Sequence, residues 1–119
     1  MRRNVFCLLA LLLAIPVFAA DIAGKWTAIF ETQIGTQNYT YTFKVDGAKV
    51  TGTAESQNGK TELAEGAVKG DEVSFVENLE YQGMAIRVEY KGKISGDEIK
   101  FSRKVGDFAT EELIAKRSK

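Results

Sequence analysis

Apolar side chains recur at every second position through much of the chain after residue 20, with Thr, Lys, Glu, Asn or Arg between them. A period of two is typical of β-strands with one buried and one solvated face. The inward residues predicted in this way are Trp26, Ala28 and Phe30; Tyr39, Tyr41, Phe43 and Val45; Met84, Ile86, Val88, Tyr90 and Ile94; and Ile99, Phe101 and Val105. We therefore expect an all-β protein.

Short segments that contain glycine separate these runs and predict tight turns. Three share one pattern, namely "VDGAKVTG" from Val45, "VKGDEVSF" from Val68 and "ISGDEIKF" from Ile94. In each, Gly stands where a hairpin turn needs a positive φ, and β-branched residues flank it. Further turns are expected at Asn58 and Gly59, near Gln82 and Gly83, and near Gly106 and Asp107, and residues 33–38 join the first two strands.

Consecutive hairpins of this kind predict an antiparallel up-and-down meander of about eight strands, curled into a closed or nearly closed barrel. The last segment, "ATEELIAKR" at residues 109–117, fits either a helix or a strand. We expect a closing strand, because eight strands can then remove both exposed edges of the sheet. The alternative is an open, strongly curled sheet.

The two residues that flank a hairpin turn pair with each other and lie on the same face of the sheet. This rule predicts which residues point inward in two more strands. Their inward residues are expected to be small, apart from one acid: Val50, Gly52, Ala54 and Ser56; and Val68, Gly66, Ala64 and Glu62. Two interpretations remain open. The large side chains of the other strands fill the space beside this small wall. Alternatively, the wall leaves a cavity at one end, lined by Tyr and Trp, that suits a small amphipathic or sugar-like ligand.

The same alternation places two charged residues inside the barrel. Glu77 lies between Phe75 and Leu79, and Arg103 lies between Phe101 and Val105. Because an unpaired buried charge is very costly, we expect Glu77 and Arg103 to pair, with Glu111 as a further acid. This pair would either plug one end of the barrel or leave Arg103 free to hold a carboxylate or phosphate of a ligand.

The N-terminal segment has the pattern of a signal peptide rather than of a folded element. Arg2 and Arg3 precede an apolar run over residues 5–15, and we expect cleavage after Ala19 or Ala20. The run is shorter than the ~20 residues of a membrane span, and an uncleaved anchor is the alternative. Residues 1–20 are thus a predicted signal peptide, and residues 21–119 a single β-barrel domain, secreted or periplasmic, without stable membrane insertion.

Composition excludes several kinds of chemistry. The chain has no His, and its one cysteine, Cys7, lies in the predicted signal peptide, so thiolate, His-dependent nucleophilic and common zinc sites are excluded. We expect no metal site and no cofactor, because the acidic turns lack calcium-loop spacing and no phosphate-binding loop is present. The sixteen basic and sixteen acidic residues show no basic face, so nucleic acid is not an expected partner.

Two segments carry a resemblance to known proteins. "DIAGKWTAIFETQIGTQNYTYTFKVDG" and "EIKFSRKVGDFATEELIAKR" resemble a small secreted bacterial β-domain that occurs alone or attached to polysaccharide-degrading enzymes of the xylanase and glycoside hydrolase type. Gly24, Lys25 and Trp26 also resemble the first strand of lipocalin-like and avidin-like barrels. The first resemblance implies a role that accompanies polysaccharide degradation, and it assigns no catalytic residues.

The sequence therefore favours a non-catalytic secreted barrel that binds a small or carbohydrate ligand. The candidate contacts are Trp26, Tyr39, Tyr41, Tyr81, Tyr90 and Arg103. One alternative is a structural or interaction module of the cell envelope, which would use residues 32–38 or the outer face of the second strand. The other is a small hydrolase with paired carboxylates, Glu77 with Glu111 or Glu31, because glycosidases use two acids across one sugar.

Overall fold

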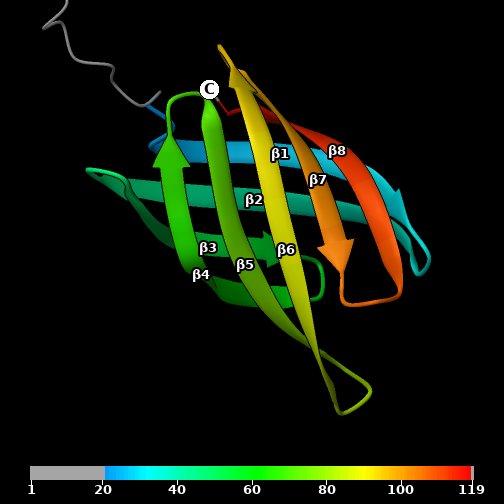
Figure 1. Ribbon diagram of the computed structural model, residues 1–119. Helices are drawn as coiled ribbons and strands as arrows, with labels where there is room; N and C mark the ends of the chain where they lie inside the picture. Colours follow the sequence, from blue (N-terminus) through cyan, green and yellow to red (C-terminus); the bar gives the residue numbers. More distant parts are fainter. Residues whose placement is uncertain (1–20, 119) are drawn as a thin grey trace, which may run out of the picture.

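A computed structural model describes residues 21–118, which form eight β-strands. The strands are β1 (Gly24–Thr32), β2 (Gly35–Asp46), β3 (Lys49–Ser56), β4 (Gly59–Lys69), β5 (Glu72–Tyr81), β6 (Met84–Ser95), β7 (Glu98–Val105) and β8 (Ala109–Arg117). Each strand pairs antiparallel with the next, and β8 pairs with β1 to close the barrel (Figure 1).

This architecture confirms the predicted eight-stranded meander and its closing strand. The turns predicted at glycines are present, and residues 109–117 form β8 rather than a helix. The expected connection over residues 33–38 is shorter than predicted, because β2 begins at Gly35 and pairs with β1 directly after residues 33 and 34. The predicted signal peptide and its cleavage site lie outside the described residues. Within residues 21–118 there is no helix long and apolar enough to cross a membrane.

The barrel consists of two curved layers that meet at β4. In Figure 1, β1, β2 and β3 run across the picture and β5, β6 and β7 run roughly upright. The pairing of β4 slips by one residue against both neighbours, between Gly66 and Glu62 on one side and between Ala67 and Ala64 on the other. Glu65, with φ 53°, lies in both intervals and is the bulged residue. A β-bulge of this kind bends its strand and increases the local twist.

The bulge corrects the inward assignment for β4. One extra residue reverses the alternation on its N-terminal side, so Leu63 rather than Ala64 packs against the core, and Glu62 is exposed. On the C-terminal side, Gly66 and Val68 face inward as expected, opposite Val50 and Val73. At Gly66 a Cβ would lie 2.1 Å from the Val50 carbonyl oxygen, so only glycine fits this close approach.

The middle of the barrel is filled by aromatic side chains. Phe75 and Tyr90 stack with ring centroids 4.4 Å apart, and Tyr41 and Phe101 meet Tyr90 edge-on at 5.6 Å each. These rings are all almost fully buried. The interpretation in which large side chains fill the space beside the small wall therefore holds for this part of the interior.

One end of the barrel, called here the closed end, holds the β2–β3, β4–β5 and β6–β7 turns and is sealed by Trp26. The Trp26 indole donates a hydrogen bond of 2.9 Å to the Ile22 carbonyl oxygen, and the Arg117 guanidinium lies 4.5 Å from its ring centroid. Arg117 also donates to the carbonyl oxygens of Asp21 and Ala23. Trp26 and Ile22 are completely buried as a result.

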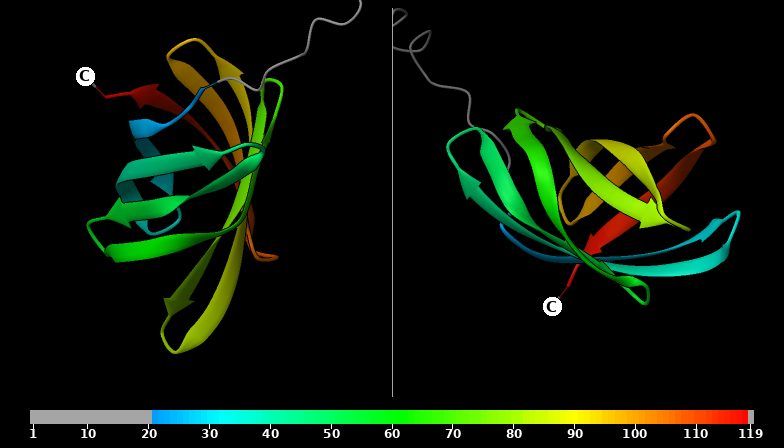
Figure 2. Two further views of the ribbon diagram at one scale, coloured as in Figure 1. Left: turned by 90° about the vertical axis from the view of Figure 1, so that its left-hand side faces the viewer. Right: turned by 90° about the horizontal axis from the view of Figure 1, so that it is seen from below.

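The opposite end, called here the mouth, holds the β1–β2, β3–β4, β5–β6 and β7–β8 turns. The β5–β6 hairpin projects beyond its neighbours on this side, as the left-hand view in Figure 2 shows. Its ladder continues to Tyr81 and Met84, whereas β4 stops pairing with β5 at Glu77 and β7 stops pairing with β6 at Val88. Residues 78–87 are thus a two-stranded ribbon beside the mouth.

Candidate functional site

A cavity of about 660 Å³ opens at the mouth of the barrel. Residues from all eight strands or their turns line it, and each of the four mouth turns contributes. Among the lining residues are Ile34, Gln37, Tyr39, Ser56, Lys60, Thr61, Glu77, Leu79, Glu80, Tyr81, Met84, Ile86, Arg103, Val105, Phe108 and Glu111. The cavity therefore occupies one end of a barrel whose middle and opposite end are packed.

The upper walls of this cavity are apolar. Ile34, Tyr81, Met84 and Phe108 project from three different mouth turns, and each exposes between 46 and 60% of its surface. Below them, part-buried apolar side chains of the projecting ribbon and of β7 continue the wall inward: Leu79, Ile86 and Val105. Clustered exposure of large apolar side chains is unusual in a soluble protein and commonly marks a binding surface.

The floor of the cavity is polar and is organised by Arg103 on β7. Its Nη1 donates a hydrogen bond of 2.6 Å to Glu111 Oε1, and its Nε donates one of 2.8 Å to the Tyr90 hydroxyl. Its Nη2 donates to the Tyr39 hydroxyl at 3.2 Å and lies 3.7 Å from Glu77 Oε1. The guanidinium carbon also lies 5.4–5.5 Å from the rings of Phe30, Tyr39 and Tyr90. Arg103 is therefore held on every side.

Glu77 is the fully buried acid beneath this arginine. Its two oxygens accept hydrogen bonds from the hydroxyls of Tyr39 (3.1 Å) and Tyr90 (2.9 Å), and the Tyr41 hydroxyl is 3.0 Å from that of Tyr90. The oxygens of Tyr39 and Tyr90 accept from Arg103, so both phenols direct their protons at Glu77. This arrangement fits an ionised Glu77, because a carboxylate is purely an acceptor.

Burial at the cavity floor raises the pKa values of the Glu77 carboxyl and of the nearby tyrosine phenols. Burial raises the pKa of the Glu77 carboxyl, against the opposing effects of the phenol hydrogen bonds and of Arg103. Burial is also the main cause that raises the pKa of Tyr39 to about 12, and it raises the pKa values of Tyr41 and Tyr90 above their usual range. The three phenols consequently stay neutral and act as hydrogen-bond donors.

Two polar side chains retain unused hydrogen-bonding capacity at the cavity surface. Glu111, whose side chain is 12% exposed, uses Oε1 for Arg103, and its Oε2 makes no hydrogen bond within residues 21–118. Gln37 is only 5% exposed; its Oε1 accepts from Asn58, and its amide nitrogen has no partner among the described residues. Buried polar groups are normally paired, so both point to a polar group of a ligand or to water.

The structure places the sequence-predicted contacts in two groups. Tyr39, Tyr81 and Arg103 line the mouth cavity. Trp26 lies at the closed end, and Tyr41 and Tyr90 lie deeper in the packed interior, so these three do not line it. Glu77 and Arg103 are both buried and 3.7 Å apart, but Glu111 is the nearer partner of Arg103 at 2.6 Å.

Sequence reasoning missed Gln37 as a site residue. It precedes Tyr39 by two positions on β2, so the alternation that placed Tyr39, Tyr41 and Phe43 inside also predicts an inward Gln37. The period-two alternation along β2 is therefore the signal that identifies Gln37 as an inward residue. The apolar residues Ile34 and Phe108 follow no periodic pattern, because they belong to turns, whereas Met84 begins β6 and continues the inward alternation of that strand.

The carboxylates expected for a hydrolase do not meet across an open cleft. Glu31 lies on the outside of the barrel, where it accepts a hydrogen bond of 2.6 Å from Thr36, and it does not line the mouth cavity. Glu77 and Glu111 do line it, but both lie beside the same guanidinium. The described residues contain no group of three or more acidic, His or Cys side chains able to hold a metal ion.

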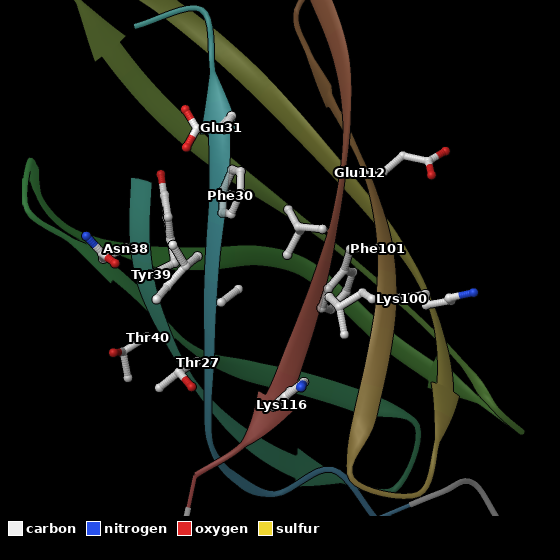
Figure 3. A pocket seen from close by; sticks show the side chains of 14 residues that line it. Thr27, Phe30, Glu31, Asn38, Tyr39, Thr40, Lys100, Phe101, Glu112 and Lys116 are labelled. Atoms are coloured by element: carbon white, nitrogen blue, oxygen red, sulfur yellow. The ribbon is translucent and has the colours of Figure 1, made fainter. Parts of the chain in front are cut away.

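A second opening, called here the seam, lies between β1 and β8. These strands pair only at Trp26 with Arg117 and at Thr27 with Lys116, and they diverge toward the mouth (Figure 3). The opening has a volume of about 960 Å³. Phe30, Tyr39, Phe101 and Leu113 lie behind it and are almost fully buried, so the side chains keep the seam shut at core level.

Comparison of the chain with models of known protein families, with curated proteins and with solved structures finds no match. The class that fold and cavity define is therefore a closed, eight-stranded antiparallel barrel with one packed end and one hollow mouth. The resemblance to a domain of secreted polysaccharide-degrading enzymes stays a prediction.

Proposed function

We propose that this protein is a secreted or periplasmic, non-catalytic binding protein that holds a small amphipathic ligand in its mouth. The observation that carries the proposal is the contrast between the walls and the floor of one cavity. Apolar side chains of the mouth turns surround its entrance, and Arg103, Glu77 and Glu111 form its base. A ligand with an apolar body and a polar head would satisfy both regions at once.

The size and composition of the cavity support this proposal. Pockets that bind small ligands usually measure about 300–1,000 Å³ and combine mostly apolar walls with a few fixed polar groups. The mouth cavity, at about 660 Å³, falls in that range. Its polar groups are fixed in advance, because Arg103 is locked by hydrogen bonds and by three aromatic rings. Preorganised groups lose little entropy when a ligand binds.

Short-chain glycosides are among the ligands of this class, in keeping with the resemblance to domains that accompany polysaccharide degradation. A sugar would offer hydroxyls to the unused groups of Gln37 and Glu111, and its apolar face to Tyr81 or Phe108. We also propose that the protein assists polysaccharide degradation by binding such glycosides.

A fluorescence titration with a neutral apolar probe, N-phenyl-1-naphthylamine, tests the proposal. We expect a saturable rise in probe fluorescence, and we expect Thr61→Phe, which places a ring in the cavity, to weaken it at least several-fold. Ile29→Ser is the control, since Ile29 is exposed beside the seam and does not line the mouth cavity. A probe that does not bind, or that binds equally to Thr61→Phe, would contradict the proposal.

A further inference from the structure

We infer that the mouth cavity selects ligands with a cationic head group, such as an amine or ammonium, and disfavours carboxylates and phosphates. This inference rests on the proposed function, because it assumes that the mouth holds an amphipathic ligand. It reverses the expectation that Arg103 offers its guanidinium to an anion.

Arg103 already uses three of its five N–H groups inside the protein. Its three nitrogens donate to Glu111, Tyr90 and Tyr39, and these bonds are 2.6, 2.8 and 3.2 Å long. Bidentate capture of a carboxylate needs two parallel N–H groups that face the ligand. An anion that approached the remaining N–H of Nη1 or Nη2 would lie close to the carboxylate of Glu111 or Glu77, which already neighbours that nitrogen.

The charge balance of the cavity is negative. At the floor, the carboxylates of Glu77 and Glu111 share the single guanidinium of Arg103. Over the whole lining, the acids Glu77, Glu80 and Glu111 exceed the bases Lys60 and Arg103 by one. Because the carboxylates of the floor lie among buried aromatic rings, solvent screens their charge less than it screens a surface charge. A cation would be attracted to this site and an anion repelled.

Glu111 supplies the contact point for such a cation. One oxygen already binds Arg103, and the other, Oε2, makes no hydrogen bond within the part of the chain that the structure describes. Its side chain is 12% exposed, so this oxygen lies in a largely desolvated position at the cavity surface. The unpaired end of the buried Gln37 amide is a second polar group of the same cavity that a ligand would satisfy.

The acidic floor and apolar walls together define the ligand class. An ammonium group at Glu111 directs an attached alkyl or aryl body outward along Leu79 and Ile86 toward Tyr81 and Phe108. A simple inorganic cation would leave these apolar walls wet. The favoured ligand is therefore an amphipathic amine rather than a metal ion.

Calorimetric titration with three compounds that share one octyl chain tests the inference below their micelle concentrations. Octylammonium is expected to bind about tenfold or more tightly than octyl β-glucoside, and nonanoate weakest, because a tenfold ratio needs only a modest change in binding free energy. Equal or tighter binding of nonanoate would overturn the inference. Binding of the naphthylamine probe without this order would overturn it and leave the proposed function standing; failure of the probe and all three compounds would refute both.

Two variants identify the side chain responsible. Glu111→Gln should reduce the preference for octylammonium over octyl β-glucoside by at least several-fold, with little change for the glucoside. Glu112→Gln is the matched control, because Glu112 is the next residue on β8 and lies on the outer face. If the preference survives Glu111→Gln unchanged, the inference is wrong. If Glu111→Gln does not fold, the order of affinities of the three compounds for the unaltered protein still tests the inference.

Discussion

Arg103 is a buried cation with two acidic neighbours, three aromatic faces and two phenol oxygens around it. Burial of an ionised group is very costly unless hydrogen bonds replace the lost water. Here the hydrogen bonds come from three strands, β2, β6 and β8, and Glu77 on β5 adds a carboxylate 3.7 Å away. The network therefore ties the two layers together as well as forming the cavity floor.

Loss of the Tyr90 hydroxyl should lower the free energy of unfolding more than loss of the Tyr41 hydroxyl. Tyr90→Phe removes the donor to Glu77 and the acceptor of Arg103 Nε, so we expect a loss of about 2–4 kcal/mol in the free energy of unfolding. Tyr41→Phe is the matched control, because the Tyr41 hydroxyl has one hydrogen-bond partner among the described residues, the Tyr90 hydroxyl, and its loss should cost about 0.5–1.5 kcal/mol. Urea denaturation measures both; equal losses would contradict the assigned network.

Glu77 should make the stability of the barrel depend on pH. Because burial raises its folded-state pKa above the ordinary value of 4.5, its folded form binds a proton more readily than its unfolded form. Its stabilising contribution is therefore full below 4.5 and is lost as pH rises through the raised pKa. We expect the stability difference between the unaltered protein and Glu77→Gln to shift in favour of the unaltered protein as pH falls from 7 to 4.5.

Thermal melts of both proteins over this pH range provide that measurement. Taking the difference cancels the contribution of surface acids such as Glu65 and Asp71, whose ion pairs lower their pKa values and lose stability at low pH. A difference that stays constant from pH 7 to 4.5 would show that the proton affinity of Glu77 is the same in the folded and unfolded chain.

At the scale of single elements, β4 determines how the two layers join. The bulge at Glu65 lets one strand belong to both layers, and Gly66 allows the bent strand to approach β3. We expect Gly66→Ala to destabilise the barrel by about 1–3 kcal/mol, because its Cβ would overlap the Val50 carbonyl. Ala67→Ser, at the next and exposed position, should change little. Denaturant midpoints compare the two, and a tolerated Gly66→Ala would contradict the close approach.

The seam between β1 and β8 is the least hydrogen-bonded junction in the barrel. Only two residue pairs join these strands, whereas ten join β5 and β6. Backbone groups that face the seam beyond Thr27 lack ladder partners, so their amides should exchange hydrogen about tenfold or more faster than amides in the β5–β6 ladder. Hydrogen exchange followed by NMR tests this prediction. Uniform protection of both junctions would show that the seam is closed in solution.

The sequence predicts β4 correctly as an element but not its bend. Alternation and turn glycines are local signals, and they predict the first seven strands and the buried Glu77 and Arg103, whereas residues 109–117 are predicted as a strand because eight strands close the sheet. A bulge depends on how neighbouring strands meet, which no local pattern in residues 59–69 reveals. As a result Ala64 and Glu62 were assigned inward, and Leu63, which packs on the core, was assigned outward.

At the scale of the whole molecule, the interior is filled at one end and hollow at the other. The aromatic residues of β2 extend along this axis, from Phe43 in the packed region to Tyr39 at the cavity floor. Sequence alone predicted their inward direction but not where packing ends. That boundary depends on the length of the projecting β5–β6 ribbon and on the spread of the mouth turns, which arise from tertiary structure.

NMR chemical-shift mapping during titration with octylammonium tests the central claim most directly. The account predicts saturable shifts concentrated on mouth residues such as Gln37, Leu79 and Glu111, with little change at closed-end residues such as Val68 and Ile99. It would be contradicted by a titration without saturable shifts, or by shifts concentrated at the closed end or along the seam.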